Sequence, residues 1–355
     1  MPAIRVLQLH SLLQAKESSG VLKSVQSYFT IFVEILFIMT GKIHRLTLIL
    51  SFLAMPFSNS TAQNNSIAKK LLEQEFNLVP EHSKDTQYYH MESKIQNHAP
   101  DGTPLGWDVY RLYLRFVPSG DPSKGDEYTC LKFTFQLSKS PEVFIPSLAN
   151  WTYRFVLTPN GKDEKGQVFG IDHSKFEKLT DENGKAIAAG NSYFIYNAFI
   201  DFHSLVMFSE KTAAGKGIQD LRHIGDKIVH AAAFTEAPVS LGGNVAEGSY
   251  FKNGEVTLEF KALAAINGKT CALLEYDSGE SSFYMLMKPM VNMEVTTRGS
   301  SHYWGDIYKD LSGGWIQRGT LHEIVISEST LPGQSNKVNS VFERSIDIRN
   351  VKHAE

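Results

Sequence analysis

Two short stretches of the chain place a histidine close to a carboxylate, a combination that acid–base catalysis often uses. The first is Ser301–Asp306, in which His302, Tyr303 and Trp304 precede Asp306 beside a glycine. This composition is typical of a loop that contacts a ligand. We therefore take His302 and Asp306 as candidate catalytic residues, and Tyr303 and Trp304 as candidate ligand contacts. The competing and more common interpretation is the start of a strand whose aromatic rings cap the core.

The second stretch is Asp201 to His203, within an apolar and aromatic segment of sixteen residues, Tyr193–Phe208. Aromatic and β-branched residues slightly favour a long central strand over a buried helix here. On a strand, Asp201 and His203 share one face, where they could bind a metal ion or act as a base with its orienting acid. Both are therefore candidate catalytic residues, although a structural hydrogen-bonded pair is the more common meaning of this spacing.

Acidic residues also gather around one glycine. Glu275, Asp277 and Glu280 lie near Gly279 and supply the oxygen ligands that calcium prefers, but such a pattern more often forms a solvated turn. The sequence contains no P-loop, dinucleotide-binding glycine pattern, G-x-S-x-G or H-E-x-x-H motif. We predict no metal site and no cofactor. The sequence does not exclude an enzyme that uses a pair of catalytic carboxylates, because such a pair has no recognisable motif in a single sequence.

The chain has two cysteines, Cys130 and Cys271. Their separation excludes a C-x-x-C metal or redox motif. In an exported protein a disulfide between them is chemically allowed. Two buried free thiols are the other interpretation, which we favour.

Period-two alternation of apolar and polar residues predicts the strands that position these side chains. The predicted inward-facing residues are Leu112, Leu114 and Phe116, then Leu131, Phe133, Phe135 and Leu137, and later Val256, Leu258 and Phe260. Residues 250–327 are predicted to form an antiparallel meander of about six strands, with a glycine-containing hairpin turn at 312–314. The predicted fold class is mainly β, with antiparallel meander sheets and a few short helices.

The strands of the two halves can be aligned with each other, with residues 112–116 opposite 256–260 and Cys130 opposite Cys271. This alignment suggests two duplicated half-barrel or sandwich-like units. The alternative is that the alignment is accidental, because any two strands with alternating apolar residues can be aligned when the length of the gap is chosen freely. We divide the mature chain into a β-rich N-terminal half (63–210), a helical or loop connector (211–249) and a β-rich C-terminal half (250–355).

Residues 39–62 match a secretory signal peptide, in which basic residues precede the apolar run Leu46–Phe57 and small residues lead to a cleavage position after Ala62. The run is shorter than the roughly 20 residues of a membrane-spanning helix. Residues 1–38 then indicate either translation from Met39, with an artefactual extension before it, or a doubly anchored N-terminus. We expect an exported bacterial protein in the periplasm, at the outer membrane or outside the cell, and not an integral membrane protein after cleavage.

The amino-acid composition and the net charge limit which classes of partner we expect this protein to bind. The chain is 42% hydrophobic and 21% charged, which is typical of a folded globular protein. Its formal net charge is only -3, and acidic and basic residues are interspersed along the chain. A nucleic-acid-binding protein needs a concentrated basic surface, so we expect no nucleic-acid partner.

Met285 and Met287 belong to a group of methionines that suits an irregular apolar surface, although core packing also accounts for it. In architecture alone, an exported chain of long meandering strands crossed by helices resembles the half-barrel lipoprotein carriers. This resemblance implies a non-enzymatic protein that holds a lipid or another apolar or amphiphilic molecule on a concave sheet, which is our leading hypothesis. The alternatives are a surface interaction or adhesion module and an exported glycan hydrolase or lyase.

Overall fold

The computed structural model describes residues 69–99, 101–121, 123–155, 167–238, 245–290, 293–331 and 337–352. The chain separates into two units, residues 1–71 and 72–355, and the strands and the helix α5 belong to the second. The predicted signal peptide (39–62) and the segment before it (1–38) lie outside the described residues.

Strands dominate the second unit. They are β1 (Gln87–His98), β2 (Pro104–Val117), β3 (Asp126–Leu137), β4 (Val143–Phe144), β5 (Trp151–Phe155), β6 (Lys227–Val229), β7 (Glu236–Pro238), β8 (Tyr250–Lys252), β9 (Thr257–Ile266), β10 (Lys269–Asp277), β11 (Ser281–Met290), β12 (Met293–Asp310), β13 (Ile316–Thr330) and β14 (Lys337–Val351). The helical elements include the α-helix α5 (Ala189–Phe208) and the 3-10 helices η3 (Pro146–Leu148), η4 (His173–Phe176) and η5 (Ile218–Asp220).

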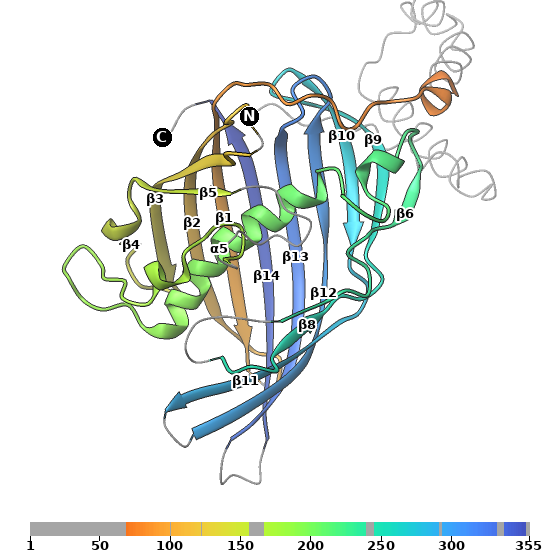
Figure 1. Cartoon of the computed structure of the whole chain (residues 1–355). Helices are drawn as coiled ribbons and strands as arrows, with labels where there is room; N and C mark the ends of the chain where they lie inside the picture. Colours follow the sequence, from red (N-terminus) through yellow and green to blue (C-terminus); the bar gives the residue numbers. More distant parts are fainter. Residues whose placement is uncertain are drawn as a thin grey trace, which may run out of the picture. The chain divides into compact units, whose positions relative to one another are not determined.

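The fourteen strands form a single sheet whose main path is β4-β3-β2-β1-β14-β13-β12-β10-β9-β6. Neighbours along this path pair in antiparallel fashion. The path ends at β4 and at β6, so the sheet is open and not closed into a barrel (Figure 1). The predicted fold class, mainly β with antiparallel sheets, is confirmed.

Two duplicated units are not confirmed. β1 pairs with β14 along its length, from Tyr88 opposite Val351 to His98 opposite Val341. Strands from the two halves of the chain therefore lie side by side in one sheet, instead of in two separate half-barrels or sandwiches. Alternation indicates which side of a strand is buried, but it does not say which strand lies next to it.

β12 is the longest strand, with 18 residues, and it connects two regions of the sheet. Its C-terminal part, residues 304–310, pairs with β10, whereas its N-terminal part pairs with β11. Its other edge pairs with β13 through the predicted hairpin. The predicted meander is thus present but modified, because β11 leaves the main path and also pairs with β8.

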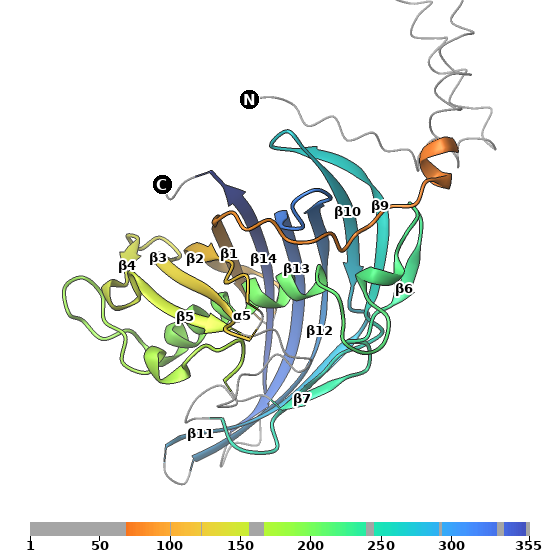
Figure 2. The ribbon, with the colours of Figure 1, turned by 45° about the horizontal axis from the view of Figure 1, so that its top comes forward.

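The helix α5 crosses one face of the sheet, which curves around it (Figures 1 and 2). Phe199 of the helix packs against Phe133 of β3, with ring centroids 5.8 Å apart. Phe208, at the end of the helix, stacks on Tyr276 of β10 at 5.0 Å. The helix therefore covers the sheet from one side to the other. We call the face that it covers the inner face, and the opposite face the outer face.

Because Tyr193–Phe208 is helical, the predicted central strand is wrong. Among the α5 residues whose side chains are described, only Gly190 is exposed. η4 also packs on the helix, with the ring of Phe176 5.3 Å from that of Tyr196 and 5.4 Å from that of Phe199. Because almost none of the helix is exposed, its sequence has no polar face and lacks a clear amphipathic period. Its sequence pattern is therefore the same as that of a buried strand.

The predicted core positions of β2 are buried, with Leu112, Leu114 and Phe116 at most 2% exposed. β3 differs from the prediction at one position. The pairing register of β2 and β3 shifts so that Cys130 and not Leu131 is the partner of Leu114. Leu131 thus lies in a β-bulge, which inserts one residue and reverses the faces beyond it.

Cys130 and Cys271 are buried free thiols. They belong to β3 and β10, which are six strands apart along the sheet path, or roughly 29 Å along the sheet at about 4.8 Å per strand. A disulfide requires Cα atoms within about 7 Å of each other, so the bridge that the sequence allowed is not formed. Burial raises the pKa of Cys271 to about 12, which keeps this thiol protonated and unreactive.

Candidate functional site

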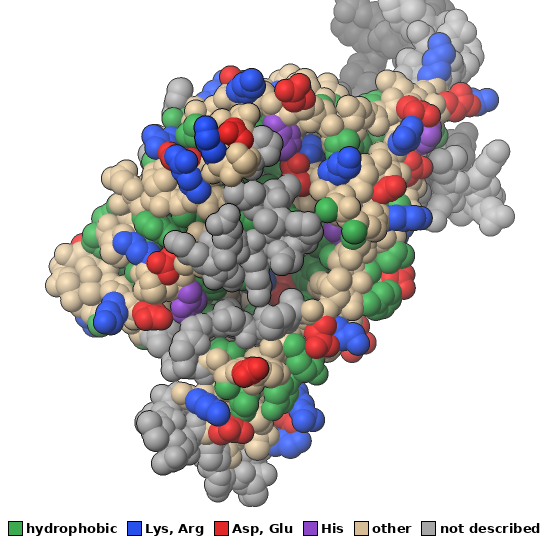
Figure 3. Space-filling model, in the orientation of Figure 1, with side chains coloured by type: hydrophobic (Ala, Val, Ile, Leu, Met, Phe, Trp, Pro, Cys, Tyr) green, Lys and Arg blue, Asp and Glu red, His purple; other side chains and the backbone are tan. Residues whose placement is uncertain are grey.

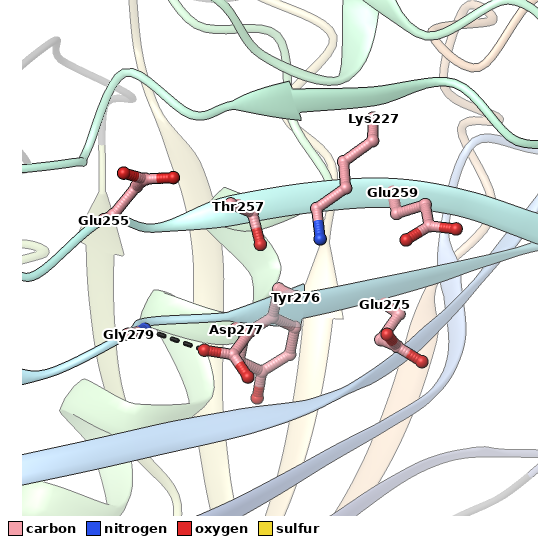
Figure 4. A pocket seen from close by; sticks show the side chains of 8 residues that line it. All are labelled: Lys227, Glu255, Thr257, Glu259, Glu275, Tyr276, Asp277 and Gly279. Atoms are coloured by element: carbon pink, nitrogen blue, oxygen red, sulfur yellow. Dashed lines mark hydrogen bonds between the residues drawn. The ribbon is translucent and has the colours of Figure 1, made fainter.

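A surface pocket of about 310 Å³ lies over β6, β9 and β10 (Figure 4). Its lining is mostly polar and rich in carboxylates, from Lys227, Glu255, Thr257, Glu259, Glu275, Tyr276, Asp277 and Gly279. Lys227 lies directly opposite Glu259, which lies opposite Glu275 on the next strand. The pocket is therefore built on polar side chains of the outer face.

Three residues singled out in the sequence lie beside this pocket. His302, Trp304 and Asp306 are alternate residues of β12, so this stretch is a strand, as the more common interpretation held, and not a ligand-contacting loop. The Nε2 atom of His302 is 3.0 Å from Oδ1 of Asp277, a pocket residue. The ring of Trp304 lies 5.0 Å from that of His302 and 5.9 Å from that of His322. The structure thus brings His302 and Trp304 together on the outer face.

Carboxylates stand directly opposite one another in this region. Glu275 has Glu259 as its cross-strand neighbour on one side and Asp306 on the other. Like charges at such positions destabilise a sheet. Lys261 offsets part of this repulsion, because its Nζ atom lies 3.1 Å from Glu259 and 3.6 Å from Glu275. Burial, and then the charge of Glu275, raise the pKa of Asp306.

The outer pocket offers little for catalysis. The side chains of His302 and Asp277 are 50% and 47% exposed, so water competes for their hydrogen bond and screens their charges. Asp277 also accepts from the backbone N–H of Gly279 at 2.7 Å (Figure 4). Within the described ranges, no group of three or more His, Cys, Asp or Glu side chains is placed to hold a metal ion. The charged groups of this pocket mainly pair with each other.

Polar side chains also form a row across the inner face, where Tyr303 lies opposite Glu323, and Glu323 lies opposite Arg344. Arg344 donates from Nε to Glu323 at 2.7 Å and from Nη1 to Asp201 of α5. The hydroxyl of Ser301 donates to the other oxygen of Glu323 at 2.6 Å. One guanidinium group thus joins the helix to two strands through two carboxylates.

The ion triad of Asp201, Arg344 and Glu323 is largely buried, with side-chain exposures of 14%, 15% and 8%. Two carboxylates share one guanidinium, so the fully ionised triad has an excess negative charge. Burial raises the pKa of Asp201 to about 6, an effect that Arg344 opposes and Glu323 increases. Asp201 is therefore the group of this triad that exchanges a proton in mildly acidic solution.

We expect Asp201→Asn to remove one component of the pH dependence of stability. Folding raises the pKa of Asp201 from 3.8 to about 6, so its stabilising contribution is complete below about pH 3.8 and is lost as the pH rises through about 6. A shift of about two units corresponds to roughly 3 kcal/mol. Urea unfolding at a series of pH values should show this decline in the wild type and not in the variant.

The control for that experiment is Asp347→Asn, which removes a carboxylate that pairs with Arg349 on the outer face. This variant should keep the wild-type decline. An equal decline in wild type and Asp201→Asn would show that Asp201 is not the titrating group.

His203 points away from Asp201, because residues two apart on a helix do not face each other. The predicted pair is therefore not formed. The Nε2 atom of His203 lies 2.8 Å from the hydroxyl of Tyr153 on β5, and the residue is 2% exposed. Burial lowers the pKa of His203 to about 3, so the ring is neutral. The contact joins α5 to β5 inside the core.

Toward the end formed by β11 and β12, the inner face carries apolar side chains interspersed with small polar residues such as Thr297 and Ser329, whose hydroxyl groups are 2.8 Å apart. Phe283, Met285 and Met287 of β11 pair with β12 positions that share a face with Tyr303. Val325 of β13 lies on the same face, opposite Ser301, and is 4% exposed. Figure 3 looks onto this side and shows hydrophobic side chains among charged ones near β8 and β11. The two methionines singled out in the sequence thus have apolar neighbours.

Glu323 and Arg344 were not among the site residues predicted from the sequence. Each occupies an inward position of a strand whose neighbouring inward positions are apolar, Leu321 and Val325 beside Glu323, and Ile346 beside Arg344. A charged residue in the apolar phase of a strand needs a partner, because an unpaired buried charge is costly. The signal in the sequence was a negative and a positive residue, each at an inward position of a strand that is otherwise apolar on that side.

Membrane-spanning helices are not found among the described residues, since none of their helices combines the necessary length with sufficient hydropathy. Comparison with known proteins assigns the chain to no family. No protein-family model matches it, and no curated protein matches it.

Proposed function

We propose that this protein binds an amphiphilic ligand on the inner face of its sheet and does not catalyse a reaction. One observation carries the proposal, namely the change in side-chain character along β11 to β14. At one end Met285 and Met287 lie beside small polar residues such as Thr297, and they give way to the charged and polar row of Tyr303, Glu323 and Arg344 beneath α5. An apolar tail would lie against the first region and a polar head group at the second.

This composition fits a small-molecule site, which typically combines apolar surface with a few fixed polar groups. Methionine suits the apolar part, because its flexible thioether chain adapts to irregular partners. The polar part is held rigidly, since Arg344 is bonded to both Glu323 and Asp201. The expected export of the chain would bring it to the cell envelope, where amphiphilic molecules are abundant.

The glycan hydrolase or lyase suggested by the sequence has less support. His302 and Asp306 lie on the outer face, where the bond of His302 to Asp277 is half exposed. A general acid or base works best when its pKa is tuned by an enclosed site. Asp201 and His203, the other catalytic candidates, point to different sides of α5 and are occupied by structural partners.

The test is native mass spectrometry of the protein purified from its own host, followed by extraction under denaturing conditions. We expect an additional mass on the native protein and an amphiphilic molecule in the extract. A surface-adhesion module would instead give only the mass of the polypeptide. That result, together with failure of the delipidated protein to bind a fluorescent apolar dye, would reject the proposal.

A matched pair of variants locates the site. Met285→Gln with Met287→Gln replaces two inner-face thioethers by polar chains of similar shape, whereas Leu286→Gln changes the residue between them, which points to the other face. Burying a methionine side chain contributes about 1.5–3 kcal/mol, so we expect the double variant to weaken dye binding at least about tenfold. Leu286→Gln should bind as the wild type does. Equal affinities in all three proteins would place the ligand elsewhere.

A further inference from the structure

His230 follows β6 and faces the inner side of the sheet. Its backbone N–H donates to the carbonyl oxygen of Val256 at 2.8 Å. Ile228, two residues earlier and therefore on the same face, belongs to the buried core. The imidazole ring lies 5.2 Å from the ring of Phe208, at the C-terminal end of α5, and His230 is 8% exposed. The side chain is therefore enclosed between β6 and the helix.

One nitrogen of the His230 ring is bonded and the other is not. The backbone N–H of Ala232 donates to Nδ1 at 3.1 Å, so Nδ1 is the acceptor nitrogen and Nε2 carries the hydrogen of the neutral ring. Burial lowers the pKa of His230, which favours this neutral form. The buried Nε2–H has no acceptor among the described residues.

An unpartnered buried donor is unfavourable, because the hydrogen bond that it made to water in the unfolded chain is not replaced. Native proteins satisfy the great majority of such groups. His230 could be replaced by many apolar residues if it only filled space beside Phe208. A polar ring with one free donor is better explained by an acceptor that arrives with a ligand.

His230 and the ion triad lie beneath the same helix. His230 contacts Phe208, and Arg344 contacts Asp201. These two helix residues are seven positions apart, or about two turns and roughly 10 Å along α5, and so share one side of it. Tyr303, the cross-strand neighbour of Glu323, donates from its hydroxyl to the side-chain oxygen of Asn253 at 2.8 Å. The free donor therefore belongs to the polar part of the proposed site.

We propose that His230 donates its Nε2–H to an oxygen of the ligand's head group, and that this oxygen belongs to a neutral carbonyl such as an ester. The inference rests on the proposed function. A neutral donor binds a neutral acceptor without requiring a charge to be buried. An anionic head group would also meet the excess negative charge of Asp201 and Glu323 around Arg344.

Two substitutions separate the roles of the two ring nitrogens. His230→Asn keeps a side-chain oxygen near the position of Nδ1, where it can accept from Ala232, but has no donor at the position of Nε2. His230→Gln places an amide N–H near the position of Nε2. Methyl laurate, whose ester oxygens only accept, and tridecane, which has no polar group, are used as probes. Their affinities are measured by displacement of N-phenyl-1-naphthylamine from the delipidated full chain.

We expect His230→Asn to weaken methyl laurate binding about three- to tenfold, the effect of one hydrogen bond, and to leave tridecane binding unchanged. His230→Gln should recover most of the loss. Equal affinity of wild type and His230→Asn for methyl laurate would overturn the role of His230 while leaving the proposed function intact. If the wild type binds neither the dye nor either probe, the proposed function fails, and this inference fails with it.

Discussion

His203→Gln should abolish a large loss of stability that the wild-type protein shows between about pH 6.5 and pH 3. The folded chain holds this imidazole in its neutral form, because burial lowers its pKa from 6.5 to about 3. Its stabilising contribution is therefore fully present above about pH 6.5 and is lost as the pH falls through about 3. A shift of between three and four units corresponds to roughly 5 kcal/mol, a large part of the stability of an ordinary domain.

Glutamine is the appropriate replacement, because its side chain can still form a hydrogen bond with the hydroxyl of Tyr153 but does not titrate. The measurement is the free energy of unfolding in urea at a series of pH values. His302→Gln removes a half-exposed histidine from the outer face and serves as the control. We expect the wild-type slope in this control. A slope of the same size in His203→Gln would exclude His203 as its cause.

The pH dependence assigned to Asp201 has the opposite sign. Its contribution to stability is lost as the pH rises through about 6, whereas that of His203 is lost as the pH falls. The two residues are neighbours on α5, so the wild-type profile between about pH 4 and 6 contains two partly cancelling slopes. The variants Asp201→Asn and His203→Gln, measured together, separate them.

Arg344→Met is expected to destabilise the protein by about 3–5 kcal/mol. The guanidinium group of Arg344 is bonded to Asp201 and Glu323, and all three side chains are at most 15% exposed. Removing it leaves two carboxylates near each other without a cation, in a region from which water is largely excluded. The helix would lose its charged attachment to the centre of the sheet.

The same strand provides a matched control. Arg349 of β14 also pairs with a carboxylate, Asp347, but its side chain is 62% exposed on the outer face. Exposed ion pairs contribute less than about 1 kcal/mol, so Arg349→Met should have a small effect. Urea denaturation of both variants at neutral pH gives the comparison. Equal losses would show that Arg344 is not specially important for attaching α5.

A double substitution tests whether the cost comes from the unpaired carboxylates. Asp201→Asn combined with Arg344→Met removes one of the two negative charges that Arg344 neutralises. We expect the double variant to lose less stability than the sum of the two single losses, because the two residues are coupled. Additive losses would indicate that the lost packing of Arg344 dominates.

The functional candidates illustrate the limits of motif spacing. Asp201 and His203 were predicted to form a pair because residues two apart share a face of a strand. On the helix that the structure shows, their side chains point to different sides. The functional interpretation of His302 and Trp304 required a loop, yet both lie on the outer face of β12, while Tyr303 between them faces inward. The residues that instead share the inner face, Tyr303 and Arg344, are far apart in the sequence and come together only through strand pairing.

The sequence alone determined the mainly β class and much of the strand core, because alternation records which side of each strand is buried. Leu112, Leu114 and Phe116 are examples whose burial follows directly from their spacing. Only the tertiary structure decided that β1 pairs with β14, that α5 is a helix and that Arg344 meets Asp201. Pairing between distant strands depends on contacts that local spacing does not encode, and a helix of which almost nothing is exposed has no polar face to reveal its period.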